Sequence, residues 1–196
     1  MIAFAVLFIL VYIAGSINFA ILVLKVIGEA DPRTQFSGNA GTTNVYRQAG
    51  PAWAAVVLLL DLGRALAAAA IAVNFLPVTV VPWIGFSLVV GNRFPCFHQF
   101  RGGKGVAGFL GFTIPLAPVA AVVAALAWVA VHRIVCIPFV ASFFMISTLA
   151  IGTMIAYSSE VVAATGTIAT ALLIVFNHRQ NMTALMQERR KSHENQ

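Results

Sequence analysis

The sequence predicts an all-α membrane protein, with about seven transmembrane segments in a single domain over residues 1–196. Of the 196 residues, 60% are hydrophobic and only 9% are charged, whereas a soluble globular domain carries about 25% charged residues. Apolar stretches of roughly the 20 residues that a span requires cover most of the chain, and polar residues gather at 25–50, 98–105 and 177–196. A soluble enzyme is therefore excluded, and so is a separate soluble module.

Six apolar stretches are candidate spans: 2–24, 51–77, 79–97, 106–131, 134–157 and 160–176. The first lacks the basic start and short apolar core of a cleaved signal peptide, so we expect it to be retained as a span. Pro115 and Pro118 interrupt the fourth, and proline breaks or kinks a helix interior. We therefore expect a short segment at about 105–115 and a returning one at about 117–131, an arrangement tolerated where such segments line a polar cavity.

The division of the fourth stretch follows from the distribution of charge. Basic residues mark the cytoplasmic side of a membrane protein, and they flank alternate turns, at Lys25, Arg33 and Arg47 and again at Arg93, Arg101 and Lys104. The turn at 76–81 carries no charge. If the fourth stretch crossed once, Arg133 and the basic tail would face outward. With seven segments they face inward, so we expect a periplasmic N-terminus and a cytoplasmic C-terminus.

The first loop is a candidate anion site. It reads Ser37-Gly38-Asn39-Ala40-Gly41-Thr42-Thr43-Asn44 and is followed by Arg47. Small hydroxyl and amide side chains with two glycines leave backbone N–H groups available for an anion, and an arginine adds a charged fork. The same composition is also typical of a flexible polar loop of turn residues.

The second loop, Arg101-Gly102-Gly103-Lys104-Gly105, lies directly before the proposed short segment. Glycines permit close backbone approach, Lys104 supplies a point charge, and a following helix N-terminus adds its dipole. The spacing does not match a Walker loop. Two such loops on one membrane face predict a phosphorylated substrate, or two of them.

Two further pairs of residues stand out. Asp61 and Arg64 lie inside the second span, three residues apart and so on one helix face. Such a pair either fixes helix packing or faces a cavity. His178 and Asn181 stand where the last span ends. The histidine there is either a general base or an interfacial residue without a role, and we assign no role to His98, His132 or His193.

Several kinds of chemistry lack the residues that they need. No nucleophile motif is present, and Asp61 is the only acid in a span, so we expect no metal site and no cofactor. Cys96 and Cys136 have neither metal nor redox spacing and are expected only to pack. The net charge of +6 is confined to a few short stretches, a pattern that indicates membrane topology and small-anion binding rather than nucleic-acid binding.

In order along the chain, these motifs resemble those of the bacterial acyl-phosphate:glycerol-3-phosphate acyltransferases, the PlsY family. The similarity runs through Gly15-Ser16-Ile17-Asn18-Phe19, Asp31-x-Arg33, Ser37 to Arg47, the pair Asp61 and Arg64, Gly91 to Ala107, and His178-Arg179-x-Asn181. The resemblance implies transfer of a fatty acyl group from acyl phosphate to the 1-hydroxyl of glycerol 3-phosphate, giving lysophosphatidate for phospholipid synthesis. It also implies a multi-pass protein of the bacterial inner membrane with cytoplasmic site loops, and a functional partner that supplies acyl phosphate.

Our hypothesis assigns roles accordingly. Ser37 with Gly38, Asn39, Thr43, Asn44 and Arg47 holds one phosphate, and Lys104 with Gly102, Gly103 and Gly105 holds the other. His178 and Asn181 complete the catalytic site, and the base is either His178 or a substrate phosphate oxygen. The acyl chain lies in a groove open to membrane lipid.

Two other functions are compatible with the same loops. One is a transporter of a phosphorylated solute, although the inverted repeats common in transporters are not evident. The other is a catalytically weak paralogue that acts as a membrane scaffold. In favour of the second, Asn92 and Arg190 stand where the family usually has His and Glu.

Overall fold

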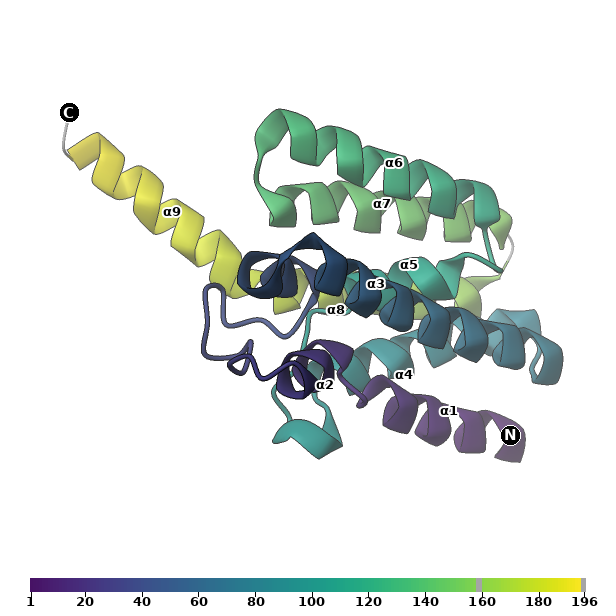
Figure 1. Cartoon of the computed structure of the whole chain (residues 1–196). Helices are drawn as coiled ribbons and strands as arrows, with labels where there is room; N and C mark the ends of the chain where they lie inside the picture. Colours follow the sequence, from purple (N-terminus) through teal and green to yellow (C-terminus); the bar gives the residue numbers. More distant parts are fainter. Residues whose placement is uncertain (158–159, 195–196) are drawn as a thin grey trace.

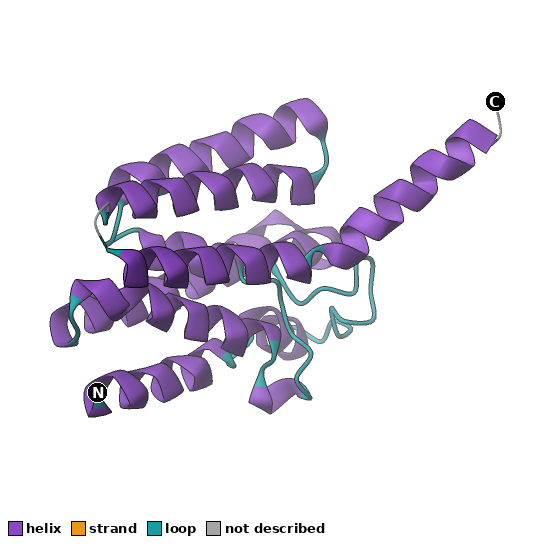
Figure 2. Cartoon of the chain, turned by 180° about the vertical axis from the view of Figure 1, so that it is seen from behind, coloured by secondary structure: helices purple, strands orange, loops and turns teal. Residues whose placement is uncertain are grey.

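The computed structural model describes residues 1–157 and 160–194, and over this part the chain is helical without a strand. Figures 1 and 2 show the helices running roughly side by side, with one long helix projecting at the C-terminus. The helices are α1 Ile2–Gly15, α2 Phe19–Val26, α3 Thr42–Phe75, α4 Val81–Arg93, α5 Val106–Thr113, α6 Pro118–Val135, α7 Pro138–Ala156, α8 Val161–Asn177 and α9 Arg179–Glu194. Short 3-10 turns, η1 at Val78–Val80 and η2 at Cys96–His98, flank α4.

The chain is a multi-pass membrane protein. Five segments of the described chain are long and apolar enough to cross a bilayer: Ile2–Val26, Thr42–Phe75, Val78–His98, Pro118–Val135 and Pro138–Ala156. A sixth is possible if α8 and the first part of α9, bent by 42°, count as one. The helix α5 has only eight residues, which extend about 12 Å, less than half of a hydrocarbon core of about 30 Å.

The expected break in the fourth stretch is present, because α5 ends at Thr113 and α6 begins at Pro118. Two other expectations need correction. The first stretch is not one helix but breaks between Gly15 and Phe19, where the Asn18 side chain caps α2 by accepting from the Ile21 N–H at 3.0 Å. Residues 42–50, expected as loop, form the start of α3, which kinks at Gly50–Pro51 because proline cannot donate within a helix. The polar tail, for which the sequence analysis gives no secondary structure, forms α9.

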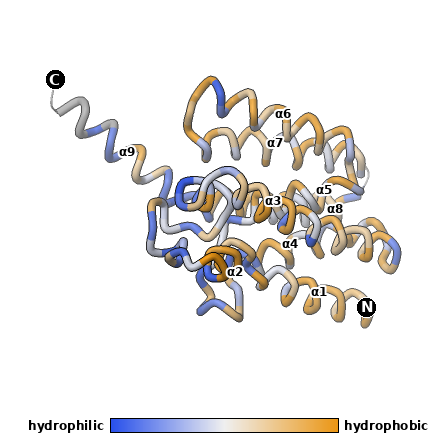
Figure 3. Tube along the Cα trace, in the orientation of Figure 1, coloured by the Kyte–Doolittle hydropathy of each residue, from blue (hydrophilic) through white to orange (hydrophobic). Residues whose placement is uncertain are grey.

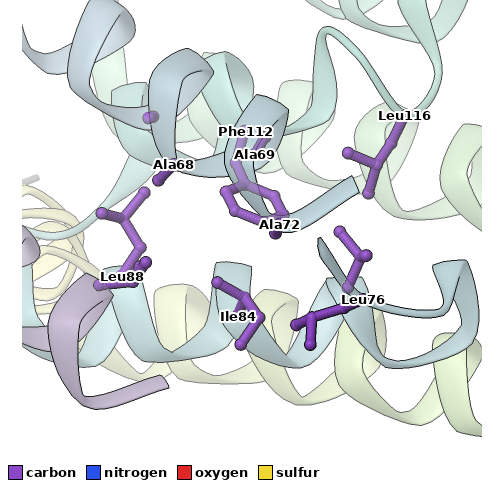
Figure 4. Packing of buried hydrophobic residues seen from close by; sticks show 11 residues of the cluster. Ala68, Ala69, Ala72, Leu76, Ile84, Leu88, Phe112 and Leu116 are labelled. Carbon is purple, nitrogen blue, oxygen red and sulfur yellow. The ribbon is translucent and has the colours of Figure 1, made fainter. Parts of the chain in front are cut away.

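Small residues allow the helices to approach closely. In lipid there is little hydrophobic drive for helix association, so packing of backbones across small residues carries more of it. A Cβ atom at Gly91 of α4 would lie 2.2 Å from the Tyr12 carbonyl oxygen of α1, and one at Gly111 of α5 would lie 2.7 Å from the Leu62 carbonyl oxygen of α3. Figure 4 shows the core beside these crossings, where Phe112 of α5 lies against alanines of α3 and close to Ile84 of α4.

All the longer loops lie at one end of the bundle (Figure 1). This end, which we call the loop end, carries residues 27–41, 94–105, 136–137 and 178. The opposite end carries residue 1 and the turns at 76–80 and 114–117. Figure 3 shows that hydrophilic segments gather at the loop end. The hairpin of α6 and α7 forms a layer beside the other helices (Figure 2).

The close crossing of α1 and α4 gives a test of the fold. Gly91→Ala should destabilise the protein by about 1–3 kcal/mol, the usual cost of overpacking, because the three nearest atoms that the new Cβ meets, in Tyr12 and Gly15, are all backbone. Gly63→Ala is the matched control, since a Cβ there meets nothing within 4 Å and alanine is the better helix former. Thermal unfolding in detergent should show a lower midpoint for the first variant only. Equal midpoints would mean that α1 and α4 do not cross at this glycine.

Candidate functional site

A cavity of about 640 Å³ lies at the loop end, between α3, α5, the α6–α7 hairpin and the start of α9. Most of its polar lining comes from the first loop, the second loop and the junction of α8 with α9, and further polar groups come from Asp61, Asn92, Ser142 and Glu188. Its apolar lining comes from residues deeper in the helices, namely Leu58, Leu110, Ala125, Trp128, Val129 and Met145. The cavity therefore has a polar part next to the loops and an apolar part within the membrane region.

Most of the residues singled out from the sequence line this cavity. They are Ser37, Asn39, Thr43, Arg47, Asp61, Lys104, Gly105, His178 and Asn181, which come from segments as much as 144 residues apart (181 − 37). Gly38, Asn44, Arg64, Gly102 and Gly103 do not line it. The structure thus brings the two loops and the α8–α9 junction together. The predicted residues fall into two groups: those that line the cavity and can contact a ligand, and those that lie behind its wall and support it.

Asn44 belongs to the second group. It is 1% exposed, and its side-chain Nδ2 donates to the carbonyl oxygens of Pro32 at 2.7 Å and Gln35 at 3.0 Å. Its Oδ1 accepts a longer bond, 3.4 Å, from the Ser37 N–H. Asn44 therefore holds the first loop in shape against the start of α3.

Gly102 and Gly103 join the second loop to α4 and to the first loop. Their N–H groups donate to the carbonyl oxygens of Arg93 at 3.2 Å and Asn92 at 2.9 Å. A Cβ on Gly103 would lie 2.6 Å from the carbonyl oxygen of Ala40 and equally close to Asn92 Oδ1. These glycines are needed because two backbones meet here, and the prediction that they contact the ligand is not supported by their position.

Two side chains reinforce the junction of the loops. Asn18, 1% exposed, donates from Nδ2 to the Ala40 carbonyl oxygen at 3.2 Å. Arg33 forms an ion pair with Asp31 at 2.6 Å and also donates to the His98 carbonyl oxygen at 2.8 Å. Both side chains hold the first loop in place, Asn18 from the start of α2 and Arg33 through the turn at His98. In the sequence they stood out only as members of motifs, and no structural role was predicted for them.

Lys104 is the central charge of the polar part. Its Nζ donates to Asn181 Oδ1, and its carbonyl oxygen accepts from Asn177 Nδ2 at 3.2 Å. Burial, together with the positive charges of Arg47 and Arg93, lowers the pKa of Lys104 to about 8. The described residues form two ion pairs, Asp31–Arg33 and Asp61–Arg64, and Lys104 belongs to neither of them. The polar part therefore presents crowded positive charge that an anion would relieve.

His178 is held from two sides. Its Nδ1 lies 2.8 Å from the Ile174 carbonyl oxygen, and because a carbonyl only accepts, Nδ1 carries the proton in the neutral ring. Nε2 is then left as an acceptor. The ring also packs edge-on against Phe143 of α7, with centroids 5.4 Å apart. Phe143 thus positions the histidine, a role that no sequence pattern indicates for one phenylalanine among fifteen.

The ion pair expected within the second span is present, with Arg64 Nη2 donating to Asp61 Oδ1 at 2.7 Å. Asp61 lines the cavity, whereas Arg64 extends to the break between α1 and α2. There its Nη1 donates to the carbonyl oxygens of Ala14, Gly15 and Ile17. The pair satisfies carbonyls that the break leaves without helical partners and connects the break to the cavity wall.

Other wall residues could not be recognised from the sequence. Trp128 Nε1 donates to Ser142 Oγ at 3.2 Å, and that hydroxyl donates to the Pro138 carbonyl oxygen at 3.0 Å, joining α6 to α7 along the wall. Cys136 also lines the cavity, and both cysteines are exposed, so the expectation that they only pack is wrong. Among the residues that the structure describes, no cluster of three or more His, Cys, Asp or Glu could hold a metal ion.

The arrangement suits a ligand that has an anionic head and a hydrocarbon tail. The starts of α3 and α5 border the polar part, and the first N–H groups of a helix have no partner within it. Lys104 and Arg47 add full charges, and His178 and Asn181 add a neutral acceptor and an amide. The apolar part extends from this polar part into the membrane region, so one molecule could occupy both.

The chain is similar to several known proteins. A sequence model of the family described as glycerol-3-phosphate acyltransferase matches residues 5–188. The glycerol-3-phosphate acyltransferase of Pseudomonas paraeruginosa is 36% identical over 185 residues, which cover 93% of this chain and 96% of the relative. The crystal structure of PlsY, an integral membrane glycerol 3-phosphate acyltransferase, in its glycerol 3-phosphate form matches with a TM-score of 0.88 at 30% identity, over 95% of this chain and 94% of that one. The lysophosphatidic acid form matches with a TM-score of 0.84 at 29% identity, over 95% and 93%.

Proposed function

This chain belongs to the glycerol-3-phosphate acyltransferase family, and we propose that it transfers a fatty acyl group from acyl phosphate to the 1-hydroxyl of glycerol 3-phosphate. The products are lysophosphatidate and inorganic phosphate, and the reaction serves phospholipid synthesis. The observation that carries the proposal is the cavity itself, in which Lys104 and Arg47 line a polar part continuous with an apolar part. The similar PlsY structures, in glycerol 3-phosphate and lysophosphatidic acid forms, support the same acceptor and product.

The two phosphates divide between the two loops. Ser37, the N–H groups at the start of α3 and Arg47 hold one phosphate, and Lys104 with the N–H groups at the start of α5 holds the other. Because Gly102 and Gly103 do not line the cavity, the second site depends on Lys104 and on the helix start rather than on those glycines. Charge-assisted hydrogen bonds of this kind are stronger than neutral ones and fix geometry.

The reaction needs no covalent enzyme intermediate, because acyl phosphate is already an activated anhydride. The 1-hydroxyl oxygen of glycerol 3-phosphate attacks the acyl carbonyl carbon, the bond from that carbon to the phosphate oxygen breaks, and phosphate leaves with the electron pair. The hydroxyl proton passes to His178 Nε2 or to a substrate phosphate oxygen. Orientation and preorganised donors supply most of the acceleration, with Asn181 holding Lys104 in place.

The membrane arrangement follows from the same charges. We place the loop end on the cytoplasmic side of a bacterial inner membrane, with seven segments and a periplasmic N-terminus, since basic residues mark the cytoplasmic side. Acyl phosphate then enters from the bilayer between α3 and α6, and glycerol 3-phosphate enters from the cytoplasm. An enzyme that supplies acyl phosphate is the expected functional partner.

The direct test is an assay of the purified full-length protein. With acyl phosphate and glycerol 3-phosphate it should form lysophosphatidate, and with acyl-CoA it should form little or none. Equal rates with acyl-CoA would overturn the donor assignment. Absence of product with either donor would instead favour a transporter or a scaffold.

Kinetics of three variants test the residue roles. Hydrogen bonds to charged groups contribute roughly 1.5–3 kcal/mol, so Lys104→Ala and Arg47→Ala should each lower kcat/KM by about 10- to 100-fold. Lys25→Ala is the matched control, since Lys25 is exposed and lies outside the cavity.

His178→Ala distinguishes the two candidate bases. A general base contributes about 10²- to 10⁴-fold, so kcat should fall by that factor with KM for glycerol 3-phosphate little changed. A raised KM with kcat preserved would make His178 a binding residue and the substrate phosphate the base. Wild-type kinetics in Lys104→Ala, Arg47→Ala and His178→Ala alike would show that the site lies elsewhere.

A further inference from the structure

Three arginines at the loop end lie outside the catalytic cavity. Arg93 is the last residue of α4, Arg101 belongs to the second loop, and Arg179 is the first residue of α9. None of them lines the cavity. In the part of the chain that the structure describes, the ion pairs are Asp31–Arg33 and Asp61–Arg64, so none of these three arginines takes part in one.

Packing brings these arginines together. The helices α4 and α8 pack against each other and both end at the loop end (Figure 1). The Gly102 N–H donates to the Arg93 carbonyl oxygen at 3.2 Å, which brings Arg101 beside the end of α4. Asn177 Nδ2 donates to the Lys104 carbonyl oxygen, also at 3.2 Å, which brings the end of α8 to the same loop. The positive charges of Arg101 and Arg179 both act on the Arg93 guanidinium.

The helix dipole accounts for Arg93 and Arg179 singly, but not for Arg101 or for the three cations together. A cation near a helix C-terminus is stabilised by the dipole. Arg93 ends α4 in this way, and Arg179 lies two residues after the end of α8. Three neighbouring cations repel one another, and among the described residues none of the three forms an ion pair. The Arg93 Nε is also buried without a hydrogen-bond partner. A phosphate between them would relieve both costs, because the planar guanidinium matches phosphate oxygens.

The surface next to the arginines indicates the source of that phosphate. The guanidinium of Arg179 lies over the ring of Phe176, 4.2 Å from its centroid. Phe176 ends an exposed apolar stripe along one face of α8, formed by Ile168, Leu172, Val175 and Phe176. Phe97 and Phe100, in and beside the second loop, are also exposed. Aromatic residues with basic neighbours are typical of the membrane interface, where anionic headgroups lie.

We propose that Arg93, Arg101 and Arg179 bind the headgroup phosphate of an anionic phospholipid whose acyl chains lie along the exposed stripe of α8. The bound lipid steadies the second loop and the α8–α9 junction, the two segments that carry Lys104 and His178. The site requires only that the chain crosses a membrane, so it stands or falls separately from the reaction.

Lipid binding can be measured by native mass spectrometry of the purified full-length protein in neutral detergent. Phosphatidylglycerol should bind at least about 10-fold more tightly than zwitterionic phosphatidylcholine, since each basic residue near an anionic headgroup contributes about 5-fold. Arg93→Gln and Arg101→Gln should each weaken phosphatidylglycerol binding by about 5-fold. Arg133→Gln removes an exposed arginine at the end of α6 and should leave binding unchanged.

The controls separate the lipid from other anions. Arg101 is exposed on a loop, so Arg101→Gln keeps the test valid even if Arg93→Gln fails to fold. Excess inorganic phosphate should not displace phosphatidylglycerol, and displacement would assign the arginines to soluble phosphate. Excess glycerol 3-phosphate should not displace it either, and displacement would place the lipid in the catalytic cavity. Equal binding of both lipids, or equal binding by wild type and Arg101→Gln, would overturn the proposal.

Discussion

A positive charge held in a partly desolvated position, outside the Asp31–Arg33 and Asp61–Arg64 ion pairs of the described residues, determines the layout of this protein. Lys104 lies between a loop and a short helix, bonded through its ammonium to Asn181 and through its carbonyl oxygen to Asn177. Burial of a charge near other charges of the same sign is unfavourable, so the surrounding structure must enforce it. The two glycines before Lys104 allow the loop to lie against Asn92 and Ala40, and Asn18 holds Ala40 from the break between α1 and α2. An anionic substrate that binds beside Lys104 then offsets the unfavourable free energy of burying its ammonium group.

The membrane explains why so many segments are broken. In an uninterrupted helix the backbone N–H and C=O groups are hydrogen-bonded to each other, whereas a substrate with phosphates needs N–H donors that are still free. The break before α5, the break before α2 and the junction of α8 with α9 supply such donors or allow loops to approach, and each lies beside polar partners. Non-helical backbone is tolerated at membrane depth where it lines a polar cavity or is buried in protein. The segments before α5 and at the α8–α9 junction line the cavity, whereas Ser16 and Asn18, in the break before α2, are buried. The Asp61–Arg64 pair follows the same logic, since Arg64 donates to carbonyls at the end of α1.

Much of the candidate site could be predicted because polar residues are rare in this chain. Ser37, Arg47, Lys104, His178 and Asn181 stood out against an apolar background, and the charge pattern with Pro115 and Pro118 located the break before α6. Residues whose role depends on tertiary contact could not be found this way. Phe143 is one of many phenylalanines until its ring meets His178. Gly102 and Gly103 looked like ligand contacts, and only the nearby Asn92 and Ala40 backbones explain them. The tail was recognised as polar, but no pattern in it was used to predict the helix α9.

The titration of Lys104 tests the central claim most directly. The chain has three lysines, Lys25, Lys104 and Lys191. In a Lys25→Arg, Lys191→Arg background with ¹³Cε-labelled lysine, the NMR signal of Lys104 is the only one left. Without ligand its pKa should lie near 8, below the ordinary 10.5, because burial and neighbouring cations disfavour the charged form. Saturating glycerol 3-phosphate should raise that pKa, because a bound dianion favours the ammonium. An ordinary pKa that does not change when glycerol 3-phosphate is added would contradict the account.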